Sequence, residues 1–98
     1  MDIKNLGQQG YDAYVSILDT QRTIGRYNMD APEAAELARA QLAYGRTPEE
    51  MIQLYDSVLD AANSGKRKLG TYSDAAKIAT GLAKILSESE TVQDFMDL

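Results

Sequence analysis

The 98-residue chain contains neither cysteine nor histidine. The lack of cysteine excludes disulfide bonds and thiolate nucleophiles, and the lack of histidine removes the commonest general base and transition-metal ligand. No run of residues approaches the roughly 20 apolar positions that span a bilayer, and no apolar segment follows a basic start. We therefore expect a soluble cytoplasmic protein with no membrane association, no metal site and no cofactor.

Three residue patterns that resemble catalytic or ligand sites have simpler structural interpretations. Asp56 and Asp60 lie one helical turn apart and are expected on a solvated face, without the histidines of a di-metal helical site. Ser73 and Lys77 fit a capping serine followed by a surface lysine, because nothing supplies an oxyanion hole or a second base. The segment 65–71, GKRKLGT, lacks the strand before a phosphate-binding loop and the lysine after its second glycine. We expect no enzymatic activity.

The length and composition indicate one helical domain over residues 1–98. A chain of this size buries roughly 60–65% of its unfolded surface, which leaves a narrow margin of stability. The chain has 13 alanines, which pack helices closely but bury little area each, so a self-associated or partner-bound form would be unsurprising. The pattern does not settle whether residues 1–10 and 88–98 are ordered.

The segment 47–65, TPEEMIQLYDSVLDAANSG, has the complete pattern of an amphipathic helix. Thr47 is the expected N-cap, a proline follows in the first turn, and Glu50 completes a capping box. At 100° per residue the segment has an apolar face and a polar face. The apolar face contains Met51, Tyr55, Val58 and Ala62. The polar face contains Glu49, Gln53, Asp56 and Asp60. Asn63 or Gly65 is expected to end the helix in a left-handed turn.

Helices are also expected before and after this segment. The first runs from Tyr11 to about residues 26–28, because two earlier glycines weaken helix formation by roughly 1 kcal/mol each. The second begins at Asp30, in a D-A-P-E start, and ends at Gly45. Its weak apolar stripe favours either tight packing or a peripheral position, and its three-residue connection makes it a neighbour of the third helix. A fourth helix covers about residues 73–87.

No segment shows the period-two alternation of a strand, so the fold class is all-α. We expect a compact bundle of four main helices plus a short C-terminal helix at residues 92–98. Within that last helix, Val92, Phe95 and Met96 have the i, i+3, i+4 spacing of a helix that docks in a groove. The alternative is that the same side chains close the chain's own core.

The net charge of −5 conceals an uneven distribution along the sequence. Residues 66–86 carry five cations and one carboxylate, and acidic segments lie on both sides. The simplest interpretation is that cations after the third helix offset the negative end of its dipole. The alternative is one electropositive surface that contacts an acidic patch on a protein or a phosphate backbone. The cations are Lys66, Arg67, Lys68, Lys77 and Lys84.

Tyrosine is the commonest aromatic residue, with six copies against one phenylalanine. Tyrosine suits interfaces because it combines a large ring with a polar hydroxyl group, and Tyr72 lies beside the basic segment. Lining the edge of a small core is the simpler interpretation of any one tyrosine. The candidate partner-binding residues are Lys66, Arg67, Lys68, Tyr72, Lys77, Lys84, Phe95 and Met96.

No motif in the chain is specific to one family. The lack of catalytic groups and the polarised charge favour a non-enzymatic protein-binding module. Such a module acts stoichiometrically as a regulator, adaptor or inhibitor, and phages and plasmids encode proteins of this kind. We expect a protein partner with an acidic patch.

Two alternatives belong to other functional classes. The first is a nucleic-acid-associated regulator that uses the basic surface of residues 66–84. It does not act through a helix-turn-helix, because Asp56 and Asp60 on the third helix would repel phosphates. The second is a structural homo-oligomer, such as a homodimer, joined through an alanine-rich face. That face belongs either to the second helix or to the fourth, at Ala75, Ala79 and Ala83.

Overall fold

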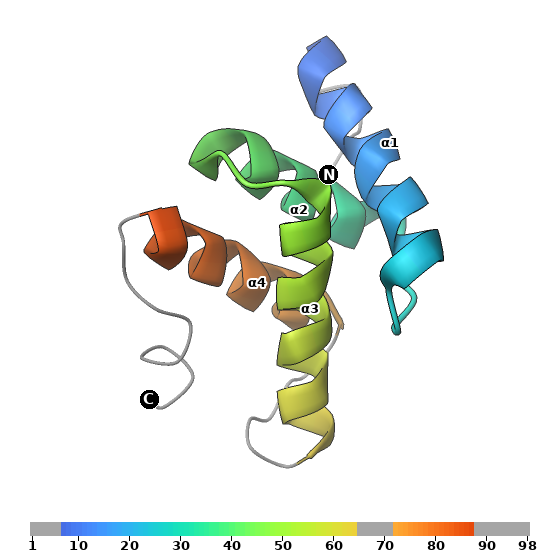
Figure 1. The fold of residues 1–98 in the computed structure, drawn as a ribbon, viewed down its shortest axis with the longest axis vertical. Helices are drawn as coiled ribbons and strands as arrows, with labels where there is room; N and C mark the ends of the chain where they lie inside the picture. Colours follow the sequence, from blue (N-terminus) through green and yellow to red (C-terminus); the bar gives the residue numbers. More distant parts are fainter. Residues whose placement is uncertain (1–6, 65–71, 88–98) are drawn as a thin grey trace.

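The computed structural model describes residues 7–64 and 72–87, and this part of the chain folds into four α-helices without a strand (Figure 1). The helices are α1 Gly7–Ile24, α2 Ala31–Tyr44, α3 Pro48–Asn63 and α4 Tyr72–Ser87. The all-α class and the four main helices are therefore confirmed. The predicted short helix at residues 92–98 lies outside the described residues. None of the described helices is both long and apolar enough to cross a lipid bilayer.

The predicted helix start signals are present at α2 and α3. The Asp30 side chain accepts a hydrogen bond from the Glu33 backbone N–H at 3.0 Å, and the chain is extended at Asp30. Thr47 and Glu50 form the reciprocal capping box, with hydrogen bonds of 3.1 and 3.2 Å between each backbone N–H and the other side chain. These bonds satisfy first-turn N–H groups that have no partner within the helix.

Both ends of α1 differ from the sequence prediction. α1 begins at Gly7 rather than Tyr11 and ends at Ile24 rather than at residues 26–28, and Gly10 within it is buried. The helix thus includes both glycines despite their low helix propensity. Asn63 is still helical, and Ser64 after it has φ −87° and donates its backbone N–H to the Asp60 carbonyl at 2.9 Å, so Asn63 does not form the expected left-handed turn. The alternative position for that turn, Gly65, lies outside the described residues.

The helices pack so that α2 and α3 each contact both α1 and α4, whereas α1 and α4 do not contact each other within the described ranges. In Figure 1, α1 and α4 lie on opposite sides of the α2–α3 pair. The short connection does make α2 and α3 neighbours, but each packs more extensively on α1 and α4. α2 is therefore central rather than peripheral.

The core contains both the large apolar side chains of α3 and the small side chains of α2 and α4. The largest fully buried side chains are Tyr55, Ile17, Leu37, Met51, Ile52, Leu82 and Val58. The fully buried alanines include Ala34, Ala35, Ala38, Ala75, Ala79 and Ala83. The two alanine-rich faces considered for subunit contact therefore pack within the chain itself, which contradicts that part of the homo-oligomer hypothesis.

Replacing two glycines by alanine should change stability in opposite directions, because Gly45 has a left-handed backbone conformation and Gly81 lies inside a helix. Gly45 caps α2 with φ +65°, a left-handed conformation, so Gly45→Ala should lower the free energy of unfolding by about 1 kcal/mol. Gly81 lies inside α4, and no described atom comes within 4 Å of a Cβ built on it. Gly81→Ala should therefore raise the free energy of unfolding by about 0.5–1 kcal/mol. Urea unfolding measures both, and shifts of the same sign would contradict the prediction.

Candidate functional site

Two of the eight candidate partner-binding residues have described side chains. Lys77 and Lys84 are both exposed on α4, as their helical spacing predicts. Tyr72 begins α4, and its side chain lies outside the described part of the structure. The remaining candidates, Lys66, Arg67, Lys68, Phe95 and Met96, also lie outside the described residues.

The outer face of α4 is a row of three residues, Lys77, Gly81 and Lys84, which we name the lysine row. Its two lysines are seven residues apart, or about 10.5 Å along the helix axis. Thr80 lies beside the row, and its hydroxyl group donates to the Ala76 carbonyl at 2.9 Å. Among residues 7–64 and 72–87, no carboxylate lies within ion-pair distance of either lysine. Within these ranges, both ammonium groups are exposed and have no ion pair.

The arginines of the described chain show a different pattern. Arg22 pairs with Asp19 at 3.7 Å, Arg46 pairs with Glu50 at 3.0 Å, and Arg26 pairs with Asp60. Arg39 on α2 is exposed and, within the described ranges, has no ion pair. Among the described residues, the lysine row thus has two cations without an ion pair on one helix face.

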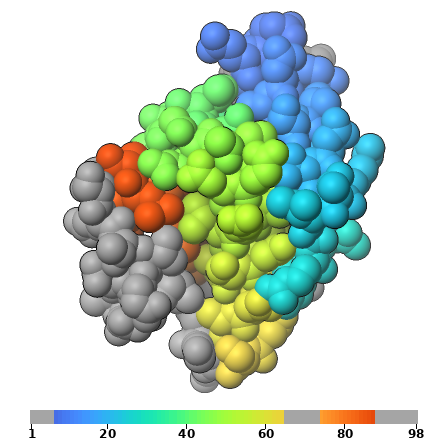
Figure 2. All heavy atoms as spheres, in the orientation of Figure 1, coloured from blue at the N-terminus to red at the C-terminus, as the bar shows by residue number. Residues whose placement is uncertain are grey.

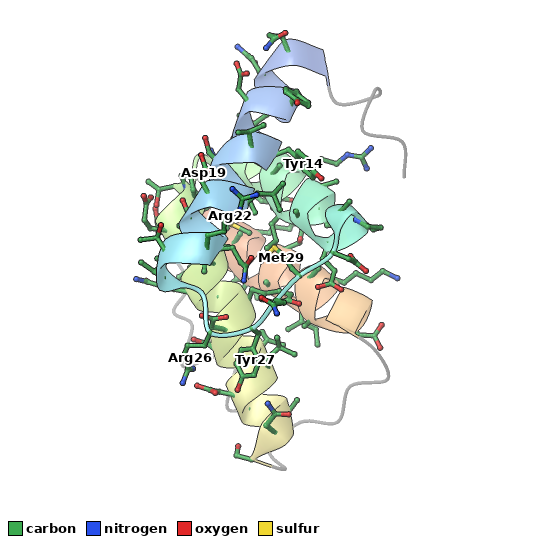
Figure 3. The ribbon with its side chains drawn as sticks, turned by 90° about the vertical axis from the view of Figure 1, so that its right-hand side faces the viewer. Tyr14, Asp19, Arg22, Arg26, Tyr27 and Met29 are labelled. Carbon is green, nitrogen blue, oxygen red and sulfur yellow. The ribbon has the colours of Figure 1, made fainter. Side chains whose placement is uncertain are left out.

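The sequence interpretation of Asp56 and Asp60 as a solvated face is wrong for Asp56, which is 7% exposed. The connection between α1 and α2 folds back over α3 (Figure 3) and contacts the part of its polar face that carries Asp56 and Asp60. The Arg26 backbone N–H donates to Asp56 Oδ2 at 3.0 Å, and the Tyr27 hydroxyl group donates to Asp60 Oδ1 at 2.8 Å. Both carboxylates therefore hydrogen-bond to this connection and hold it against α3.

Further hydrogen bonds complete the attachment of the connection. Asn63 donates to the Tyr27 hydroxyl oxygen at 3.0 Å, and the Gln21 side-chain amide donates to the Tyr27 carbonyl at 2.8 Å. The Arg26 guanidinium lies over the Tyr27 ring, 5.7 Å from its centroid, and pairs with Asp60. Because Arg26 already supplies a positive charge beside Asp60, this cluster is a structural network and not a cation site.

A buried carboxylate lies on the first turn of α2. Glu33 is 3% exposed, and its carboxylate accepts a hydrogen bond from the hydroxyl group of the fully buried Tyr55 on α3. Burial raises the pKa of Glu33 above its ordinary value, because a charged carboxylate loses its hydration, although the Tyr55 hydrogen bond opposes this shift. Glu33 therefore links the first turn of α2 to Tyr55 in the middle of α3.

Two exposed carboxylates lie on α1, opposite in charge to the lysine row. Asp12 and Asp19 are exposed, with Ser16 half-buried between them, and we name these three residues the aspartate row. Asp12 accepts a hydrogen bond from the Gln8 side chain at 2.9 Å, and Asp19 has the long contact to Arg22. Figure 3 shows Asp19 and Tyr14 on opposite sides of α1.

Two shallow hollows lie beside the aspartate row, where α1 meets the end of α2 and the start of α3. Figure 2 shows the atoms of α1 packed directly against those of α2 and α3. One has a volume of about 330 Å³, and its lining includes Asp12, Ser16 and Leu42. The other, of about 210 Å³, is lined by residues that include Asp19, Ile24 and Glu49. Leu42 and Ile24 are 48% and 44% exposed. The row therefore has exposed apolar side chains close by.

No group of three or more acidic side chains in the described ranges is placed to hold a metal ion. No family model, curated protein or solved structure matches the chain.

The buried Glu33 carboxylate predicts a stability change with pH. Because its folded pKa is raised, its stabilising contribution is complete below the unfolded value of about 4.5 and is lost as pH rises through the folded pKa. Glu33→Gln keeps an acceptor for Tyr55 and removes the charge, so it should raise the free energy of unfolding at neutral pH. This gain should shrink toward pH 4.5. Urea unfolding at a series of pH values measures both effects.

Glu50 is a control for this prediction, because its pKa is shifted in the opposite direction to that of Glu33. Hydrogen bonding from the Thr47 backbone holds the pKa of Glu50 below its ordinary value, and Arg46 contributes in the same direction. Its stabilising contribution is present above the unfolded pKa and is lost as pH falls through the folded pKa. Glu50→Gln should therefore lower stability at neutral pH. If both variants changed stability in the same direction, the burial argument for Glu33 would be wrong.

Proposed function

We propose that the chain is a non-enzymatic protein-binding module that acts stoichiometrically, and that the lysine row of α4 contacts an acidic patch on its partner. The observation that carries this proposal is the pair of exposed lysines, Lys77 and Lys84, on one helix face without a described carboxylate partner. Complementary charge raises the association rate and selects among partners more than it adds affinity. Binding of this kind masks or bridges a surface without transforming a substrate.

The glycine between the lysines supports a close contact at this face. A glycine inside a helix lowers stability by about 0.5–1 kcal/mol relative to alanine. Packing among the described residues does not require Gly81, because a Cβ there meets no described atom within 4 Å. Without a side chain at this position, another backbone can approach the α4 axis between the two lysines. The same residue would then weaken the fold slightly and improve the fit of a partner.

Charge elsewhere in the molecule favours a protein over a nucleic acid. Residues 7–64 carry nine acidic and four basic side chains, so most of the described surface would repel a phosphate backbone. α3 is a poor candidate for a recognition helix as well, because eight of its 16 residues are buried. A protein with a local acidic patch can meet the lysine row without approaching the acidic helices.

The proposal predicts that charge reversal on α4 reduces partner recovery. The tagged chain and its Lys77→Glu/Lys84→Glu variant are used to capture proteins from a nuclease-treated extract of the source cells, and mass spectrometry reads the result. A partner recovered stoichiometrically by the wild-type chain should bind the variant with an association rate at least about tenfold lower at low salt. Both lysines are exposed, so circular dichroism should show an unchanged fold.

Arg22→Glu is the matched control, because Arg22 is equally a surface cation but lies on α1, which does not contact α4. This control should bind the partner as the wild-type chain does. Equal binding by wild type and the α4 variant would refute a role for the lysine row. Recovery that disappears on nuclease treatment would instead support the nucleic-acid alternative.

A further inference from the structure

The aspartate row of α1 and the lysine row of α4 have the same spacing. Each consists of a charged residue, a small residue four positions later, and a second charged residue three positions after that. The charges at both ends are therefore about 10.5 Å apart along each helix axis. When the two helices are laid side by side in parallel, Lys77, Gly81 and Lys84 fall opposite Asp12, Ser16 and Asp19.

These complementary rows cannot meet within one chain. α1 and α4 do not contact each other in the described part of the structure, and α2 and α3 lie between them (Figure 1). All four end residues, Asp12, Asp19, Lys77 and Lys84, are exposed. The fold therefore displays two charge patterns of matching length on opposite sides of one molecule.

We propose that the lysine row of one copy binds the aspartate row of a second copy. The small residues in the middle of both rows, Gly81 and Ser16, allow the two helices to approach closely. Exposed ion pairs contribute only about 0–1 kcal/mol each, so apolar burial must supply part of the affinity. Leu42 and Ile24, half-exposed at the hollows beside the aspartate row, provide that surface.

Other polar groups near the aspartate row affect how strongly it attracts the lysine row of a second copy. Arg22 competes for Asp19 at 3.7 Å, but both side chains are largely exposed, and this pair is easily exchanged. Glu49 lines the hollow beside Asp19 and adds negative charge. Gln8, which donates to Asp12, is neutral and leaves the charge of that carboxylate in place. The surroundings of the row therefore favour a cation.

The contact joins two different surfaces, so it is heterologous. Each copy that uses its lysine row still has a free aspartate row, and association continues into open chains unless a ring closes. Self-association also covers the lysine row, so it competes with any acidic partner for the same residues. The inference does not depend on the proposed function, because the two rows are complementary whether or not a separate partner exists.

Sedimentation velocity of the full chain tests the inference. At about 20 mM salt, the weight-average sedimentation coefficient of the wild-type chain should rise between about 10 µM and about 1 mM protein. It should return to the monomer value at about 500 mM salt, because screening weakens exposed charge pairs. Lys77→Glu/Lys84→Glu and Asp12→Lys/Asp19→Lys should each remain monomeric at low salt, since each variant presents two rows of like charge.

Mixing the two double variants is the decisive experiment. The reversed α1 row of one variant then complements the reversed α4 row of the other, and their unreversed rows complement each other as well. An equimolar mixture should regain the concentration-dependent increase that neither variant shows alone. Arg39→Glu, a charge reversal on α2 outside both rows, should associate as the wild-type chain does.

A wild-type chain that stays monomeric at about 1 mM and low salt would overturn the inference. A mixture that stays monomeric although the wild-type chain associates would also overturn it. The proposed function fails independently, because Asp12→Lys/Asp19→Lys leaves the lysine row intact and should still capture an acidic partner. Circular dichroism of every variant confirms that loss of association is not loss of folding.

Discussion

The arrangement of this molecule depends on close packing around the small side chains of α2. Ala34, Ala35 and Ala38 have no solvent exposure, and α2 packs against α1 and α4 as well as α3. Short side chains allow helix axes to approach toward the lower end of the usual 8–10 Å range. They bury little area each, so the larger side chains of α3 supply much of the hydrophobic stabilisation. This packing places α1 and α4 on opposite sides and thereby separates the two charged rows.

Much of this fold could be predicted from local sequence, because helix ends are determined by residues three or four positions apart. Asp30, Thr47 and Gly45 act at the boundaries where the sequence places them. The position of α2 was harder to predict, because its buried residues Ala35, Leu37 and Ala40 lie on different sides of the helix. A single apolar stripe does not describe a helix that other helices contact on several sides. The start of α1 was missed because helix propensity argues against a helix at Gly7 and Gly10, yet both residues lie in α1.

Some side chains of the candidate site could also be placed from local sequence, and others could not. Lys77 and Lys84 could be placed on the outer face of α4 because helical periodicity alone determines which side faces solvent. Asp56 could not, because the Arg26 backbone that covers it lies 30 residues earlier in the chain. Glu33 belongs to the D-A-P-E helix start, yet its carboxylate bonds to Tyr55, 22 residues later. Polar residues whose partners are distant in sequence are the ones that periodicity misplaces.

Surface charge and apolar area have different roles in any contact that this molecule makes. Two exposed ion pairs contribute about 0–2 kcal/mol in total, which is too little to hold two proteins together. Burying the exposed half of a leucine or isoleucine contributes about 1 kcal/mol, so Leu42 and Ile24 add a similar amount beside the aspartate row. Association through these rows is therefore weak and sensitive to salt, and its specificity comes from the shared spacing of the charges. Reversing one row has a larger effect than neutralising it, because repulsion between like charges replaces attraction.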